Sequence, residues 1–408
     1  MIRAKRENME KDTDKDMNET SLIFTGDIGF DKYMDGKWED ENLLSPEILD
    51  FLRSADHVIA NVEGPLLDAS PSGLSSPAGM AQGTAQLLHT MNPAAVKVLK
   101  AMRADIWNIC NNHIMDAGEK GLAATIRQAQ EAGASTIGAG MNIYEAREPK
   151  ILREAGGIGL FGVGYQRGCK PAGEEKGGCL NWNDMESIQH SINLIRSKCR
   201  WCIIVAHAGE EFTSLPSPYT RDRYLQYLRM GADIVVAHHP HVPMNYELAG
   251  EKAIFYSLGN FIFDTDYQRA QYNTERGVLL KLRLSPEGWS FEPFGIRIDR
   301  QNERIVKDAV PDIFENVPEE EYRLLEPLAA KMFIEATKRQ QIYLNPEEFE
   351  NADEAKWKEH FANPRRSGRV EGEALDFKII TEIAAEEAKG DWKQSRLEKV
   401  KKYILDQM

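Results

Sequence analysis

The chain has 408 residues and an ordinary apolar content of 42%, so it can bury a large core as two domains or as one α/β domain with an extension. Its formal net charge of −14 argues against nucleic acid or an anionic membrane as the main partner, but not against an anionic substrate, because a bound metal ion reverses the local field. The sequence contains no run of the roughly 18 apolar residues that a membrane span needs.

The first segments place carboxylates at the ends of two predicted strands. Residues 1–20 mix both charges and lack the apolar core of a signal peptide, which predicts a disordered leader and a cytoplasmic protein. An apolar strand at 21–26 ends just before Asp27, and a second strand, 58–62, ends at Glu63. Each carboxylate alone is a weak indication of a ligand, because such residues also cap turns or face solvent.

The next segments are a long loop and a polar strand end. Residues 68–92 are rich in Ser, Gly, Ala and Pro, which predicts a loop near the mouth of a site. The strand predicted at 105–109 then runs into Asn111, Asn112 and His113. Tandem asparagines are typical of strained turns, and the alternative is a turn with a solvent-facing histidine.

The middle of the chain adds another strand end. Residues 135–140 and 151–165 predict strands, with a Gly-Gly turn inside the second segment. The strand predicted at 202–207 ends at His207, and Glu211 follows in the next turn. A histidine after four apolar residues would, on its own, be better explained as part of the core.

The cysteines do not predict a disulfide framework. There are five, an odd number, in a long chain. Cys199 and Cys202 form a CxxC, but no second pair with zinc-site spacing exists. Because Cys202 opens an apolar run, we expect a buried, unreactive thiol there.

The most histidine-rich stretch follows the predicted strand 234–236. Three histidines lie within four residues there: His238, His239 and His241. A further apolar run, 253–256, ends at Ser257, and Asn260 comes soon after. Strand ends of α/β enzymes open onto a shared crevice, so these polar residues are candidates for a common site.

The remaining elements complete an α/β pattern. Residues 277–284 and 289–298 alternate enough to predict an antiparallel pair within one domain, 21–310. Residues 311–408 are charge-rich with amphipathic patches, which predicts a helical extension that covers the core or joins copies in a homo-oligomer. The predicted helices are 46–55, 93–102, 119–132, 184–198 and 221–230.

The polar residues at these strand ends are metal-ligand types. Carboxylate with imidazole suits Mn, Zn or Fe, with Mg and Ca as alternatives. A sulfur-bound structural zinc is disfavoured because none of the candidate ligands at these strand ends is a cysteine. A carboxylate able to bridge predicts one ion or two, a pair being about 3.5–4 Å apart.

Six motifs in this order resemble the poly-γ-glutamate capsule synthesis (CapA-type) family, which is related to the calcineurin-like metallophosphoesterases. They are GDIGF, NVEGPL, NNHIMDAG, HAGEEF, GADIVVAHHPHVP and FYSLGNFIFD. The resemblance covers about residues 21–300. It implies a four-layer α/β/β/α sandwich with a dinuclear metal site at the strand ends.

The resemblance also implies roles for single residues. Asp27 matches the first aspartate ligand, Glu63 stands where phosphoesterases place a bridging aspartate, and Asn112 and His113 match an amide ligand and a catalytic histidine. Glu211 would be a base or would orient a histidine ligand. The further implied ligands are His207, His239 and His241, and the residues expected to bind or position substrate are Asn111, Ser257 and Asn260.

One departure from the phosphoesterase pattern reduces the expected ligand set. Phosphoesterases have a second ligand two residues after the first aspartate, and this position is Gly29. The first ion would keep Asp27, Glu63 and His241 alone. If that ion is absent, the expected ligands of a single ion are Glu63, Asn112, His207 and His239.

Three functions therefore stay open. The first is metal-dependent hydrolysis or transfer at a phosphoryl or acyl centre of a small molecule, peptide or polymer, with His113 donating a proton to the leaving group. The second is an epimerase in which His113 or Glu211 removes an α-proton. The third is a non-catalytic accessory protein of capsule polymer synthesis or export.

Overall fold

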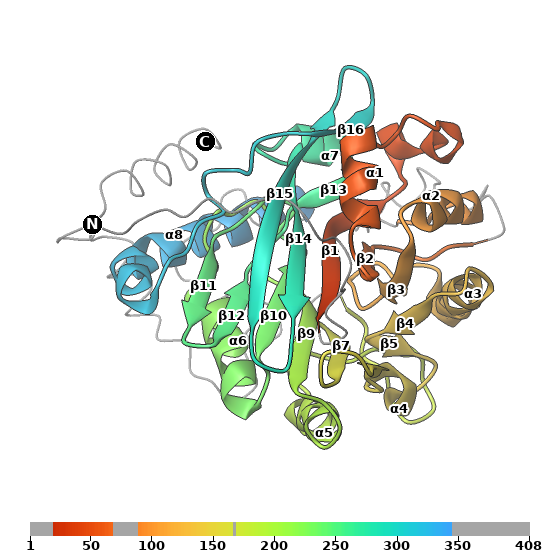
Figure 1. The fold of residues 1–408 in the computed structure, drawn as a ribbon. Helices are drawn as coiled ribbons and strands as arrows, with labels where there is room; N and C mark the ends of the chain where they lie inside the picture. The colour runs from red at the N-terminus through yellow and green to blue at the C-terminus, as the bar shows by residue number, and fades with distance from the viewer. Residues whose placement is uncertain (1–18, 68–88, 166–168, 345–408) are drawn as a thin grey trace, which may run out of the picture.

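Two β-sheets pack face to face at the centre of the molecule (Figure 1). The computed structural model describes residues 19–67, 89–165 and 169–344. The larger sheet has eight strands, of which β13 (Asn260–Phe263) pairs with β1 outside the main path. In spatial order its other strands are β16 (Arg304–Lys307), β15 (Trp289–Asp299), β14 (Arg276–Leu284), β1 (Thr20–Gly29), β2 (His57–Val62), β3 (Ala104–Asn108) and β4 (Ser135–Ile137).

The second sheet has six strands. In spatial order they are β11 (Tyr246–Ala249), β12 (Lys252–Phe255), β10 (Ile234–His238), β9 (Trp201–His207), β7 (Ile158–Gly164) and β6 (Lys150–Leu152). A separate short pair consists of β5 (Ala139–Gly140) and β8 (Gly178–Cys179).

Helices cover the outer face of each sheet. The larger sheet is covered by α1 (Pro46–Arg53), α2 (Val96–Ala101) and α3 (Gly118–Glu131). The six-stranded sheet is covered by α4 (Ile143–Ala146), α5 (Met185–Arg196) and α6 (Pro218–Met230). The remaining helices are α7 (Asp266–Arg269), α8 (Glu319–Leu344) and the 3₁₀ helices η1 (Lys32–Met34), η2 (Lys37–Glu39) and η4 (Pro93–Ala95).

Side-chain alternation along each strand produces these layers. In β1, Leu22 and Phe24 pack between the sheets, whereas Ile23 packs toward the helices. In β9, Ile203 lies between the sheets and Ile204 faces the helices on the other side. Successive residues of a strand point to opposite faces, so a continuous apolar run is buried on both. The result is the predicted metallophosphoesterase-like α/β/β/α sandwich.

Parallel pairing brings the polar strand ends together. In the larger sheet β1, β2 and β3 run parallel, with Asp27 paired in register with Asn61. In the six-stranded sheet β9 and β10 run parallel, with His207 paired with His238. The carboxyl ends of parallel strands meet at one edge, where α/β proteins form their binding crevices.

Most predicted elements are present with small changes in their bounds. The pair predicted at 277–284 and 289–298 is the antiparallel pair β14–β15, and the Gly-Gly turn joins β6 to β7. The strand predicted at 135–140 ends at Ile137, because Gly138 has a φ of 84° and turns the chain. Between β7 and α5 the structure also has the short strand β8, which the sequence pattern did not predict.

The C-terminal helix α8 packs against the protein. Tyr322, Leu325 and Ala329 of α8 form an apolar cluster with Phe212 and Val242. No helix in the described residues is long and apolar enough to cross a bilayer. Residues 1–18, 68–88 and 345–408, which hold most of the predicted leader, loop and tail, lie outside the described residues, and the division at residue 310 stays a prediction.

Candidate metal centre

Glu63 is the central residue of the site. It follows β2, and its backbone N–H donates to Ile28 O at 2.8 Å. Gly64, with a φ of 116°, and Pro65 then turn the chain away. The Glu63 side chain is 0% exposed, and neither carboxylate oxygen has a hydrogen-bond partner among the described residues. Burying a carboxylate without partners is costly, so this position suits a bound cation.

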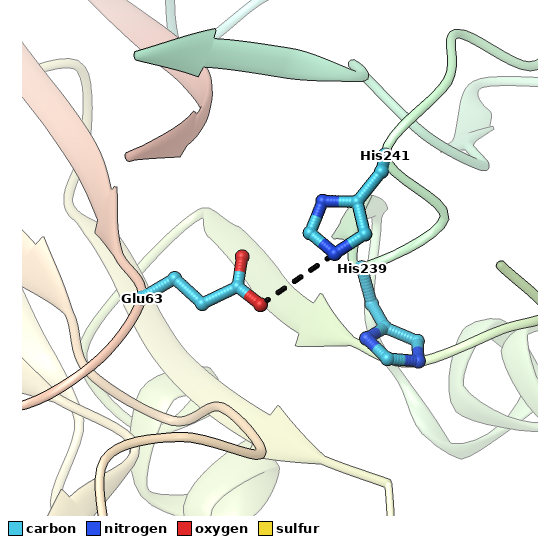
Figure 2. Close-up of side chains that lie close together, drawn as sticks. All are labelled: Glu63, His239 and His241. Carbon is cyan, nitrogen blue, oxygen red and sulfur yellow. Dashed lines mark ion pairs between the residues drawn. The ribbon is translucent and has the colours of Figure 1, made fainter. Parts of the chain in front are cut away.

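Two overlapping ligand groups share Glu63. In each group one ligand atom from every residue lies within 4.8 Å of the others. The first group is Glu63, His239 and His241, whose side chains lie together in Figure 2. The second is Asp27, Glu63 and His207. Five of the six predicted ligands therefore lie close together, but they are grouped differently from the division expected for two separate ions.

His241 connects the two carboxylates. Its Nε2 lies 3.8 Å from Glu63 Oε1, the ion pair drawn in Figure 2, and its Nδ1 lies 3.2 Å from Asp27 Oδ2. The same Nδ1 lies 2.9 Å from Asn260 Oδ1. Asn260 in turn donates to Gln268 Oε1 and Thr274 O. These bonds fix the amide of Asn260, which then orients the His241 ring through Nδ1.

His207 and Asn112 contact each other next to Glu63. The Nε2 of His207 lies 2.8 Å from Asn112 Oδ1 and 3.6 Å from Glu63 Oε1. Asn61, which the sequence analysis did not single out, donates from Nδ2 to Asp27 Oδ1 at 2.8 Å and lies 3.4 Å from His207 Nδ1. Asn61 therefore orients one carboxylate and one imidazole of the site at the same time.

The His-Pro-His turn after β10 has an unusual backbone. His239 has a φ of 97° and His241 a φ of 59°, a region that costs a residue with a side chain about 1–3 kcal/mol. The conformation turns both imidazoles toward Glu63. By contrast, His238 stays in the strand, where its Nε2 lies 2.8 Å from Thr25 O, and it belongs to neither ligand group.

Burial sets the protonation states of the ligands. Desolvation and the neighbouring imidazoles hold the pKa of His207 well below its usual value, and desolvation lowers the pKa of His239 to about 4. Burial also raises the pKa of Glu63 well above its usual value. Burial alone would lower the pKa of His241, but Glu63 and Asp27 raise it to about 10. At neutral pH the Glu63–His241 pair therefore retains a proton, whereas the other two imidazoles are neutral.

A second histidine lies beside the predicted catalytic one. His113 Nδ1 lies 2.7 Å from Asp116 Oδ2, and desolvation lowers the pKa of His113 to about 4. The ring of His89 packs on it, with 4.1 Å between ring centroids, and His89 Nδ1 lies 2.9 Å from Asp31 Oδ2. Sequence reasoning missed His89 because it stands in the stretch 68–92, where no strand pattern marks it.

The other predicted site residues surround this centre. Glu211 is half-buried. Its negative charge adds to the rise in the pKa of Glu63 and His241, and it partly opposes the fall that burial causes in the pKa of His239. Asn111 is fully buried: its Nδ2 donates to Val62 O, and its Oδ1 accepts from His113 N.

Two predicted substrate contacts are also buried. Ser257 Oγ accepts from Gly259 N at 3.1 Å, and Asn260 bonds His241 as described. Like Asn111, both have 0% exposure and make contacts within the protein. Asn111 thus holds the turn that carries Asn112 and His113, and Asn260 orients His241, whereas Ser257 holds the turn before Asn260.

Phe263 fills the space in front of Gly29, the position of the missing phosphoesterase ligand. A Cβ on Gly29 would lie 2.4 Å from Phe263 Cε2 and 2.5 Å from Cδ2. The Phe263 ring also packs on His241, with 4.9 Å between ring centroids, and on His89, with 5.2 Å. This chain therefore lacks the second phosphoesterase ligand, and the Phe263 ring occupies the space that its side chain would need.

We expect Gly29→Ala to lower the free energy of unfolding by about 1–3 kcal/mol, because the added methyl group overpacks against Phe263. Adding Phe263→Leu should reduce this cost, since the smaller side chain removes the close contact. Gly288→Ala is the control, because a Cβ there has no atom within 4 Å. Urea denaturation measures the wild type, Gly29→Ala, Phe263→Leu, the double variant and the control. Additive costs of the two changes would contradict the packing explanation.

Comparison with known proteins places the chain in a family. Residues 21–265 match the family "Bacterial capsule synthesis protein PGA_cap". The Capsule biosynthesis protein CapA of Bacillus anthracis is 28% identical over 58% of this chain and 57% of that protein. The PGA biosynthesis protein CapA of Bacillus subtilis is 27% identical over 66% and 68%.

A more distant relative is named as an accessory protein. A "Probable polyglutamine synthesis accessory protein" of Mycobacterium tuberculosis is 24% identical over 43% of this chain and 50% of that protein. The chain thus matches only part of these relatives, little more than half of the first. The family match nevertheless covers more than half of the chain, which therefore belongs to the bacterial capsule synthesis protein family PGA_cap.

Proposed function

We propose that the chain binds a divalent metal ion at Glu63 and uses it for hydrolysis or group transfer on a peptide or polymer of glutamate capsule metabolism. One observation carries the proposal: in the part of the chain that the structure describes, neither oxygen of the buried Glu63 carboxylate has a hydrogen-bond partner, and the carboxylate lies among His207, His239 and His241. Neutral imidazoles with carboxylates favour Mn, Zn or Fe. The names of the capsule proteins to which the chain is similar support the substrate class.

The residues around Glu63 supply the rest of the chemistry. A divalent ion at this position would polarise a phosphoryl or acyl oxygen and lower the pKa of a bound water. His113, held at Nδ1 by Asp116, is neutral at pH 7 and offers Nε2 as a proton acceptor. Once protonated, the same nitrogen can protonate a leaving group. Glu211 adds negative charge, which favours retention of the cation.

The neutral state of His113 also favours a second candidate, removal of an α-proton by an epimerase. A base must be unprotonated, and the low pKa of His113 keeps it so. Incubation of the metal-loaded protein with γ-glutamyl peptides in heavy water separates the two reactions. Bond cleavage without deuterium at Cα supports hydrolysis, and deuterium without cleavage supports epimerisation.

Elemental analysis of the purified protein tests metal binding directly. We expect one or two ions per wild-type chain and a loss of most of this metal in His207→Ala, because one imidazole of the shared centre is removed. His190→Ala is the matched control, since His190 is exposed on α5. A different outcome would favour the accessory role: the purified wild type contains no metal, and both the wild type and His207→Ala support capsule polymer formation.

Metal uptake should release a proton at pH 7. His241 carries a proton below its raised pKa of about 10, and a metal ion displaces it. The affinity should therefore rise with pH, by about tenfold per unit for one proton, until pH 10 is approached. Calorimetry in buffers with different ionisation enthalpies measures the proton number, and heats that do not depend on the buffer would refute it.

A further inference from the structure

Three cysteines that are far apart in the sequence meet in one buried cluster. Cys110 follows β3, Cys169 follows β7, and Cys179 ends β8. All three are free thiols and at most 2% exposed. The side chains of Cys110 and Cys169 each make a hydrogen-bond contact with the side chain of Cys179. Cys179 thus has two thiol neighbours.

Glycines make the room for these sulfurs. A Cβ on Gly164, at the end of β7, would lie 2.5 Å from Cys169 Sγ and 2.9 Å from Cys110 Sγ. A Cβ on Gly138 would lie 2.5 Å from Cys110 Cβ. A side chain at either glycine would therefore push the cysteines apart.

The cluster supports the loop of the candidate metal centre. Cys110 directly precedes Asn111, and Cys179 Sγ donates to Asn111 O at 3.5 Å. Asn112 and His113 follow in the chain, and Asn112 contacts His207. A change at the sulfurs therefore acts on the backbone beside two predicted site residues.

We propose that this cluster is a redox site, in which hydrogen peroxide links Cys179 to Cys110 or Cys169 as a reversible disulfide. The Cys179 thiolate attacks the O–O bond and becomes a sulfenic acid, and the departing hydroxide takes a proton to form water. The neighbouring thiolate then attacks the Cys179 sulfur, and a second hydroxide leaves and is protonated. Two thiols lose two electrons and two protons, and one peroxide yields two waters.

The CxxC pair is a poorer candidate, although it is adjacent in sequence. Burial raises the pKa of Cys202 to about 12 and also raises that of Cys199. The two neighbouring thiols instead lower the pKa of Cys179, which favours its thiolate. Because the thiolate is the nucleophile, the structure favours the three-cysteine cluster over the pair that the sequence motif suggests.

Peroxide treatment of the full-length folded protein, followed by peptide mapping, tests the proposal. We expect a loss of about 2 Da, reversed by dithiothreitol, and a cross-linked peptide that joins Cys179 to Cys110 or Cys169. Cys179→Ser should abolish the mass loss, whereas Cys199→Ser should leave it unchanged. Iodoacetamide, a larger reagent, should label the cluster only after unfolding, because its sulfurs are buried.

Each other outcome counts against the redox site. A Cys199–Cys202 cross-link in its place, a cross-link that forms only in urea, or no cross-link at all would overturn the proposal. The map of the wild-type protein decides this even if Cys179→Ser does not fold. Because the readout is a covalent bond and not activity or metal content, the result does not depend on the proposed metal function.

Discussion

Glu63→Gln should abolish metal binding without destabilising the metal-free protein. The Glu63 carboxylate belongs to both ligand groups, so its loss weakens every ligand set that the site can form. Without an ion, however, its two buried oxygens have no hydrogen-bond partners among the described residues, and burial raises its pKa. A neutral amide of the same shape removes the cost of that buried charge.

Thermal unfolding with and without metal measures both effects. At a free metal concentration 100 times the dissociation constant, the wild type should gain about 2.7 kcal/mol of stability, and Glu63→Gln should gain almost none. In the absence of metal the variant should be at least as stable as the wild type. A large loss of stability in metal-free Glu63→Gln would mean that the carboxylate is structural.

Glu210→Gln is the matched control. Glu210 lies in the same region of the chain as Glu211, but its carboxylate accepts hydrogen bonds from Ser217 and Thr220 at the start of α6. Replacing it should lower stability, because these bonds hold the first turn of the helix. The gain in stability on adding metal should be retained, since Glu210 belongs to neither ligand group.

The sequence was sufficient to predict the strand ends and the candidate ligands that the structure brings together there. Asp27, Glu63 and His207 each come at the end of an apolar run in the sequence, and parallel pairing then brings them to one edge of the sheets. This part of the site is predictable because periodicity and ligand chemistry are local properties of the sequence.

The remaining features depend on contacts that are distant in sequence. His89 reaches His113 from a stretch without a periodic pattern, and Phe263 fills the space in front of Gly29 from another strand. In the sequence Asn61 looks like an ordinary strand residue. One signal could have identified it as a site residue, because it is an amide in a buried apolar run, two positions before the strand-end Glu63. Which side chains meet is set by packing between strands, and a single sequence does not show that packing.

Arg221→Met should be among the most destabilising single changes in the molecule, at a cost of about 3–5 kcal/mol. Arg221 of α6 forms two hydrogen bonds with Glu247 of β11, at 2.9 and 2.7 Å, and both residues are buried. Tyr256 also donates to Glu247, and the ring of Tyr322 from α8 lies under the guanidinium, 4.5 Å from it. Removing the arginine leaves a buried carboxylate without its cation.

The double variant Arg221→Met/Glu247→Leu distinguishes the cost of a stranded charge from the value of the ion pair itself. Two apolar side chains of similar volume remove both charges, so most of the lost stability should return. Arg323→Ala is the control, because its pair with Glu319 is exposed on α8 and should contribute at most about 1 kcal/mol. If the double variant is as unstable as Arg221→Met, the pair would instead hold α6, β11 and α8 together through its own geometry.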